Sequence, residues 1–276
     1  MARQTRSSPS ARTAASKARP ARKTLKRKVA GKAKTAGRKA APAGRAPKPI
    51  DLYFWPTGNG KKITIMLEEC RLPYRIIPVN ISAGDQFKPE FLAISPNNRM
   101  PAIVDPDGPG GRPISIFESG AILQYLGRKA GRFYPADERG RVEVDQWLFW
   151  QVGGLGPMAG QANHFRNYAP EPLDYAIKRY TDEVNRLFGV MDRRLADRPF
   201  LAGRYSIADM ACIGWTLGYK RFGQDLADFP NLKRWVDAVT ARPGVQRGLA
   251  ATVENYEPHD MKDPKVRAVL FNQRAR

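Results

Sequence analysis

The chain has 276 residues, of which 42% are hydrophobic and 10% aromatic, enough to form one large or two ordinary domains with buried cores. No apolar stretch approaches the roughly 18 to 20 residues that a transmembrane helix needs, and no apolar run follows the basic start as in a signal peptide. We therefore expect a cytoplasmic protein that makes no contact with membranes.

The formal net charge of +21 is concentrated at the start of the chain. Residues 1–49 contain 16 Lys or Arg and no Asp or Glu, whereas the rest contains 31 basic and 26 acidic residues. After Met1, the large aliphatic residues of this segment are Leu25 and Val29, so we predict a disordered basic tail at 1–49. Such a charge favours non-specific contacts with phosphates, which makes nucleic acid one candidate partner.

The tail resembles histone tails in composition, and its opening ARQTRSS is similar to a histone amino terminus. Other interpretations stay open: a solubilising or accessory segment, a start codon assigned upstream of the true domain, and a mitochondrial presequence. The many Lys and Pro residues and the lack of an apolar helix face argue against a presequence.

Residues 50–134 show the pattern of a small α/β domain. The apolar run at 52–55 predicts a buried strand, and the amphipathic segment that follows Gly60 predicts a helix. Further strands are predicted at 74–79, 102–104 and 114–117, with a short helical connection at 86–94 and a helix at 118–131. The predicted order is β-α-β-α-β-β-α.

From residue 137 onward we find helical periodicity and no convincing strand. Ser206 can cap one helix while Asp209, three residues on, reaches back to the cap N–H in a capping box. The remainder is predicted to form an all-helical domain at 138–250 and an extension at 251–276 that lies along the surface. Helices are predicted at 138–159, 173–196, 207–222 and 232–241.

The turn between the first strand and the first helix is the predicted centre of chemistry. Thr57, Gly58, Asn59 and Gly60 form this turn. A turn that leads into a helix presents unpaired N–H groups and the positive end of the helix dipole, which favour an anion such as a thiolate or carboxylate.

The two cysteines, Cys70 and Cys212, lie far apart without a CxxC motif or a Cys/His cluster. The sequence therefore suggests neither a disulfide framework nor a metal site, and it fits a reducing compartment. Their neighbours indicate buried, apolar positions rather than catalytic ones.

Five segments together resemble the cytosolic glutathione transferases, and more narrowly the bacterial nu class of glutathione-dependent disulfide-bond oxidoreductases. The segments are WPTGNGKKITIMLEE, FLAISPNNRMPAIVD, IFESGAILQYL, WLFWQVGGLGPMAGQ and YSIADMAC. The resemblance implies a thioredoxin-like domain followed by an all-helical domain, glutathione as co-substrate, and a homodimer. It covers about residues 51 to 250 and excludes the tail.

The resemblance also implies which residues bind glutathione. Pro101 is expected to be cis, so that the backbone of Met100 pairs with the cysteinyl unit like an added strand. Glu118 and Ser119 are expected to bind the ammonium and carboxylate of the γ-glutamyl unit. Further contacts are expected from Gln86 to the glycyl unit and from Arg179 to a glutathione carboxylate.

Thr57 and Asn59 are the expected catalytic residues. No Tyr, Ser or Cys stands in this turn, but a hydroxyl, an amide and the N–H groups of the turn can stabilise a thiolate and lower its pKa. The reacting sulfur must then come from glutathione, and the protein contributes positioning and anion stabilisation. His164 and Phe165 are expected to line the pocket for the second substrate.

Each of these residues also has a purely structural interpretation. Thr57 and Asn59 suit any tight turn, Glu118 and Ser119 suit any helix start, and Gln86 and Arg179 suit an exposed surface. Two functions therefore compete. The first is a glutathione-dependent disulfide reductase with conjugating or peroxidase side activity, and the second is a non-catalytic regulatory module of the same fold that the tail tethers to nucleic acid.

Overall fold

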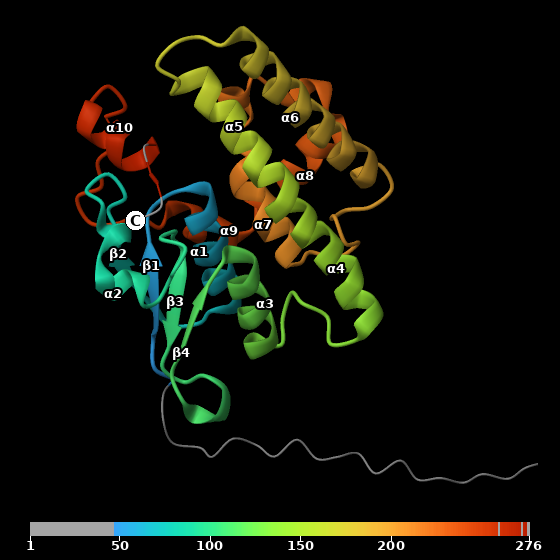
Figure 1. Ribbon diagram of the computed structural model, residues 1–276. Helices are drawn as coiled ribbons and strands as arrows, with labels where there is room; N and C mark the ends of the chain where they lie inside the picture. Colours follow the sequence, from blue (N-terminus) through green and yellow to red (C-terminus); the bar gives the residue numbers. More distant parts are fainter. Residues whose placement is uncertain (1–46, 259, 272, 275–276) are drawn as a thin grey trace, which may run out of the picture. The chain divides into compact units, whose positions relative to one another are not determined.

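A mixed sheet with flanking helices is followed by helices alone, as the sequence predicted (Figure 1). The structure is a computed structural model that describes residues 47–258, 260–271, 273 and 274. Residues 1–46 of the predicted basic tail lie outside the described residues. The described residues contain no helix that is both long and apolar enough to cross a bilayer.

The sheet has four strands in the order β2-β1-β3-β4. β1 pairs in parallel with β2 and antiparallel with β3, and β3 pairs antiparallel with β4. Leu52 at the centre of β1 stands opposite Ile76 on one side and Ile103 on the other. The strands are β1 (Ile50–Phe54), β2 (Tyr74–Pro78), β3 (Ala102–Asp105) and β4 (Ile114–Phe117).

Alternating side chains of β1 supply two cores on opposite faces of the sheet. Leu52 and Phe54 belong to the main core, which also contains α1 (Gly58–Cys70) and α3 (Ser119–Ala130). Tyr53 faces the other way, toward a small cluster that includes Phe91 of α2 (Pro89–Leu92). The larger face therefore carries α1, whose first turn is the predicted site.

The helical domain continues the main core from the sheet. A π-helical turn at Gln151–Leu155 lies within the segment predicted as one helix at 138–159, and the backbone stays helical from α4 through this turn into α5. A 3-10 turn likewise replaces the end of the helix predicted at 207–222. The helices are α4 (Glu138–Trp150), α5 (Gly156–Asn167), α6 (Asp174–Leu195), α7 (Ile207–Thr216), α8 (Pro230–Thr240), α9 (Pro243–Ala250) and α10 (Pro264–Phe271).

The predicted capping box at the start of α7 is confirmed. The Ser206 hydroxyl accepts from the N–H of Ala208 at 3.3 Å, and the Asp209 carboxylate accepts from the N–H of Ser206 at 2.9 Å. The same carboxylate accepts from the indole of Trp235 at 2.8 Å and from the N–H of Leu201 at 3.1 Å. These bonds hold α7 in position behind the site.

Two helices near the C-terminus were not predicted. α9 packs closely on α1, and a Cβ at Gly248 would lie 2.5 Å from the backbone of Ile65, so glycine is required there. α10 lies within the extension predicted to follow the surface. Arg267 of α10 donates to the carbonyl of Tyr168 at 2.8 Å, and Arg99 donates to Gln273 just after α10 at 2.8 Å. The end of the chain thus contacts both domains.

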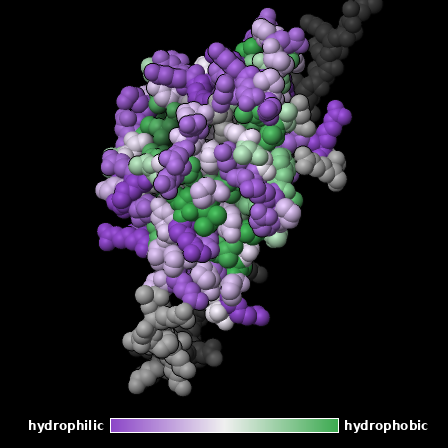
Figure 2. Space-filling view, turned by 90° about the vertical axis from the view of Figure 1, so that its left-hand side faces the viewer, coloured by the Kyte–Doolittle hydropathy of each residue, from purple (hydrophilic) through white to green (hydrophobic). Residues whose placement is uncertain are grey.

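β2 forms one edge of the sheet, on the side that carries α2 and α10 in Figure 1. Figure 2 shows this side, where hydrophilic residues surround patches of apolar surface. Arg75 of β2 is exposed and forms an ion pair with Asp51 of β1. A charged side chain on an edge strand discourages pairing with another chain.

Candidate functional site

The turn after β1 is shorter than predicted, because α1 already begins at Gly58. Thr57 is the N-cap, and its hydroxyl accepts from the N–H of Gly60 at 3.3 Å. The same hydroxyl donates to the sulfur of Met100 at 3.8 Å. A thioether is a weak acceptor, so a thiolate placed nearby would compete for this proton.

Asn59 lies in the first turn of α1 and is oriented by the helical domain. The indole N–H of Trp215, in α7, donates to Asn59 Oδ1 at 3.0 Å. Because an indole nitrogen is a donor only, its partner must be the amide oxygen. The amide nitrogen, which has two N–H donors, is therefore the group left for a ligand.

Two further segments of the site, at Met100–Pro101 and at Glu118, have unusual backbone geometry. The Met100–Pro101 peptide bond is cis, as predicted. Glu118, the N-cap of α3, has φ 68° and ψ 114°, a conformation that non-glycine residues rarely adopt. Strain of this kind costs about 1–3 kcal/mol and is concentrated at functional sites.

These segments meet in one cleft of about 380 Å³, which we call the α1 cleft. Six of the predicted site residues line it, from three separate parts of the first domain: Thr57, Asn59, Met100, Pro101, Glu118 and Ser119. The other residues that line it are Gly58, Ser95, Asn97, Arg99, Phe117 and Trp215. Its size suits a small ligand.

Trp215 is a site residue that the sequence analysis missed. In sequence it looks like one more apolar residue of a buried helix, and nothing in its neighbours marks it as functional. Gly214 next to it offers a retrospective signal, since a Cβ there would lie 2.8 Å from the carbonyl oxygen of Gly58. The glycine lets α7 approach the start of α1 and brings the indole to Asn59.

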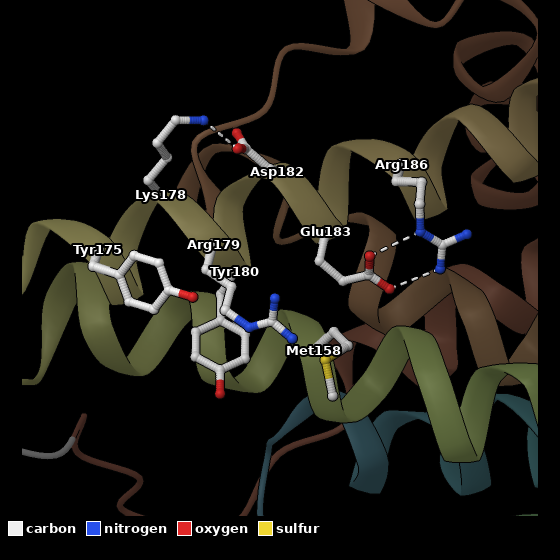
Figure 3. A pocket seen from close by; sticks show the side chains of 8 residues that line it. All are labelled: Met158, Tyr175, Lys178, Arg179, Tyr180, Asp182, Glu183 and Arg186. Carbon is white, nitrogen blue, oxygen red and sulfur yellow. Dashed lines mark hydrogen bonds and ion pairs between the residues drawn. The ribbon is translucent and has the colours of Figure 1, made fainter.

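The structure does not place Gln86 in the α1 cleft. Its side chain is buried, and its amide nitrogen donates to the carbonyl of Ile81 at 3.1 Å, within its own loop. Arg179 is also elsewhere. Figure 3 shows its guanidinium extending from α6 over α5, beside Met158, in a separate hollow.

His164 and Phe165 are also outside the α1 cleft, in an aromatic cluster. The imidazole of His164 packs edge-on against Phe271 of α10, with ring centroids 4.8 Å apart. Burial and the charge of Arg267 lower the pKa of His164. Phe165 stacks on Tyr180 of α6 at 5.4 Å. These rings fill space between α5, α6 and α10.

A second cleft of about 450 Å³ lies on the other side of the α1 turn, and we call it the aromatic cleft. It shares Thr57, Gly58 and Trp215 with the α1 cleft. A ligand in each would therefore meet beside the N-cap of α1. The remaining lining residues are Trp55, Pro56, Asn163, Tyr168, Gly214, Gly218, Arg221, Phe222, Tyr256, Pro258 and Met261.

Both cysteines lie within the described part of the chain, and neither lines either cleft. Burial raises the pKa of the half-buried Cys70 to about 11. Cys212 is fully buried in α7, which also raises its pKa. Neither thiol is ionised at neutral pH, and a thiolate is the nucleophile in disulfide exchange.

No group of three or more potential metal-ligating side chains occurs among the described residues. The α1 cleft is lined by hydrogen-bond donors, the carboxylate of Glu118, the guanidinium of Arg99 and the start of a helix. These groups can bind a zwitterionic ligand and stabilise an anionic sulfur.

Two family models match the chain. The glutathione S-transferase N-terminal domain matches residues 59–129, and the C-terminal domain matches residues 166–243. The disulfide-bond oxidoreductase YfcG of Escherichia coli K12 is 52% identical over 202 residues, which are 72% of this chain and 94% of that protein. The chain belongs to the glutathione S-transferase family.

Solved structures of this family agree. A family member from Pseudomonas fluorescens with two glutathione molecules bound is 43% identical, with a TM-score of 0.70 over 75% of this chain and 95% of that chain. A glutathione transferase from Pseudomonas putida, with one glutathione disulfide bound per subunit, is 42% identical, with a TM-score of 0.69 over 75% and 93%. The thioredoxin-like sheet domain and the helical domain are thus those of a glutathione transferase.

The strain at Glu118 predicts a difference between two substitutions. Glu118→Ala and Glu118→Gly both remove the carboxylate, but glycine has no Cβ and adopts the positive φ of 68° at a lower steric cost than alanine. We expect the free energy of unfolding of Glu118→Gly to exceed that of Glu118→Ala by about 1 kcal/mol or more. Urea denaturation of the two variants measures it, and a Glu118→Gly variant less stable than Glu118→Ala would show that the backbone is not strained.

Proposed function

We propose that this protein is a glutathione-dependent disulfide-bond reductase of the glutathione transferase superfamily, and more narrowly of the nu class. The carrying observation is that the α1 cleft offers donors for a thiolate but contains neither cysteine. Glutathione is the co-substrate and supplies every reacting thiol. The similarity to YfcG and to the glutathione-bound structures supports this assignment.

The α1 cleft suits the three parts of glutathione. The backbone of Met100, beside the cis-Pro101 bond, pairs with the cysteinyl unit as an added strand. Ser119, the first residue of α3, receives the γ-glutamyl carboxylate at the helix start, and the Glu118 carboxylate receives the ammonium. The predicted contacts of Gln86 and Arg179 with glutathione stay predictions.

Asn59 and Thr57 stabilise the glutathione sulfur as a thiolate. The amide oxygen of Asn59 already accepts from Trp215, so its amide nitrogen can donate to the sulfur. The Thr57 hydroxyl loses only its weak hydrogen bond to the Met100 sulfur when it donates to a thiolate instead. Hydrogen bonds to the charged form lower the pKa of a thiol. The positive end of the α1 dipole adds to the same effect.

The reaction consists of two thiol–disulfide exchanges. A bound glutathione thiolate attacks one sulfur of the substrate disulfide, so that a mixed disulfide forms and one substrate thiolate leaves. A second glutathione thiolate then attacks the glutathione sulfur of the mixed disulfide and releases the other substrate thiolate. Two glutathione molecules are oxidised to glutathione disulfide, and the two substrate thiolates each take up a proton.

The aromatic cleft is the proposed site for the second glutathione or the substrate disulfide. It meets the α1 cleft at Thr57 and Gly58, so two sulfurs can approach each other there. His164 and Phe165 were predicted to line this pocket, but their rings pack against α10 and α6. Neither residue is among those that line the aromatic cleft, and their contact with the second substrate stays a prediction. Conjugating or peroxidase activity would use the same thiolate.

A protein without its cysteines tests the proposed source of sulfur. We expect Cys70→Ala/Cys212→Ala to retain most of its kcat/KM for glutathione-dependent reduction of a small disulfide, because neither thiol takes part. Asn59→Ala serves as the contrasting variant, and its kcat/KM should fall about tenfold or more with the loss of a donor to the thiolate. A folded double-cysteine variant without turnover would contradict the mechanism.

A homodimer is the second part of the proposal. Several large apolar side chains are exposed on β4, α4 and α6, among them Phe149, which is 66% exposed, and Tyr175, which is 80% exposed. Large exposed apolar side chains are often found where a second subunit binds. We expect light scattering to give twice the mass of the chain and Phe149→Asp to lower it. A monomeric mass for the unmodified protein would exclude the dimer.

The competing function is a regulatory module held on nucleic acid by residues 1–49. The 16 basic residues and absence of acidic ones in this segment support salt-sensitive binding to phosphates. We expect deletion of residues 1–49 to abolish retention on DNA-cellulose at low salt and to leave disulfide reduction intact. Retention that survives the deletion would refute a role for the tail, and absence of reductase activity in both proteins would favour the regulatory function.

The two free cysteines fit a reducing compartment such as the cytoplasm.

A further inference from the structure

Lys62 is a buried lysine directly behind the α1 cleft. It lies in α1, and its side chain is 2% exposed. Its ammonium donates to the hydroxyl of Ser119 at 3.2 Å and to Gln151 Oε1 at 2.5 Å. Lysine is almost never fully buried, because removing an ammonium from water is costly unless it is hydrogen-bonded and balanced by charge. Its burial here therefore needs an explanation.

We propose that Lys62 is a positioning residue for the γ-glutamyl carboxylate of glutathione and acts through the hydroxyl of Ser119. This inference rests on the proposed function. An ammonium has donors and no acceptor, so the Ser119 oxygen must accept from it. The single O–H of Ser119 is then left to point into the cleft and to donate to a carboxylate.

The charge of Lys62 strengthens this contact. It stands behind the first residue of α3, where the helix dipole already favours an anion. A hydroxyl that accepts from an ammonium is polarised and becomes a stronger donor. Lys62 thus places a positive charge behind the bound carboxylate without exposing it to solvent, where salt would screen it.

Gln151 fixes Lys62 from the helical domain. It lies in the π-helical turn, a feature that often marks functional sites, and its amide nitrogen is buried without a hydrogen-bond partner in the described structure. A Cβ at Gly156 would lie 2.8 Å from that nitrogen, so the glycine provides room for the amide. This arrangement keeps Gln151 Oε1 directed at the ammonium.

The protonation of Lys62 makes ligand affinity depend on pH, and a purely structural role of Lys62 would not produce this dependence. Burial lowers the pKa of Lys62 to about 8, while the negative charge of Glu118 before α3 opposes this shift. Cys212 of α7 also faces Lys62, but its thiol is uncharged in this pH range because burial raises its own pKa. A carboxylate bound next to Ser119 raises that pKa again, because it favours the charged amine. Above about pH 8, binding is therefore coupled to proton uptake, and affinity falls as pH rises.

The test is calorimetric titration with S-methylglutathione, whose sulfur does not titrate. We expect Lys62→Met to bind it about tenfold or more weakly than the unmodified protein at pH 7. Lys61→Met is the matched control, because the neighbouring Lys61 donates to the carbonyls of Leu249 and Ala251, away from the cleft. It should bind as the unmodified protein does.

Three further comparisons test whether Lys62 acts on the γ-glutamyl carboxylate through Ser119. Ser119→Ala should make the Lys62 substitution nearly silent, with less than about a threefold further loss. S-methyl-cysteinylglycine, which lacks the γ-glutamyl unit, should bind Lys62→Met and the unmodified protein equally. From pH 7.5 to 9, the unmodified protein should lose up to about tenfold more affinity for S-methylglutathione than Lys62→Met does.

Several outcomes would overturn the proposal. Unchanged affinity of Lys62→Met for S-methylglutathione is one, and an equal loss for both probes is another, because it would indicate a structural role. Should Lys62→Met fail to fold by circular dichroism, Lys62→Gln replaces it, and a pH dependence identical to that of the unmodified protein contradicts the proposal. Absence of S-methylglutathione binding by the unmodified protein would instead refute the proposed function itself.

Discussion

The hydrogen bond from the Trp215 indole to Asn59 Oδ1 is the contact on which the site depends. It joins α7 of the helical domain to the first turn of α1, and it determines which end of the Asn59 amide is free for a ligand. Gly214 allows the close approach that the bond requires, since a Cβ there would lie 2.8 Å from the carbonyl oxygen of Gly58. The α1 cleft is therefore complete only when the two domains are packed together.

The bonds that hold α7 in place give this contact its rigidity. Asp209 accepts from the backbone of its own helix start, from the loop before it, and from the indole of Trp235 in α8. A buried carboxylate with this many donors is well satisfied. The core of the helical domain thus positions a group in the other domain, which explains why a distant capping motif belongs with the site.

Unfavourable features are concentrated around the start of α3. Glu118 has a strained backbone, and Lys62 is a buried charge a few ångströms from Ser119. Both lower the stability of the free protein, and both arrange groups that a zwitterionic ligand would use. Such features persist only where the surrounding packing over-determines them. Here α1, α3 and α7 meet, and most of their inward residues belong to one core.

The sequence by itself determined the order of the elements, the cis proline position and six residues of the α1 cleft. The element order and the Ser206 capping box follow from local patterns, whereas the cis proline and the pairs Met100–Pro101 and Glu118–Ser119 followed from the resemblance to the glutathione transferases. Periodicity also predicted the main helices, although it could not reveal the π-helical turn at Gln151–Leu155, because a single turn is too short for its i→i+5 bonding to be recognised from the spacing of apolar residues.

Only the tertiary structure decided which distant residues complete the site. Trp215, Lys62 and Gln151 come from three helices, and each looks in sequence like an ordinary core or surface residue. Their roles arise from contacts across 57 to 156 positions of the chain, which no local pattern records. Gln86 shows the converse: the family resemblance assigned it to glutathione, but its side chain is buried and bonds within its own loop. A side chain's partner depends on how whole elements pack, and that packing is a property of the folded chain rather than of any segment.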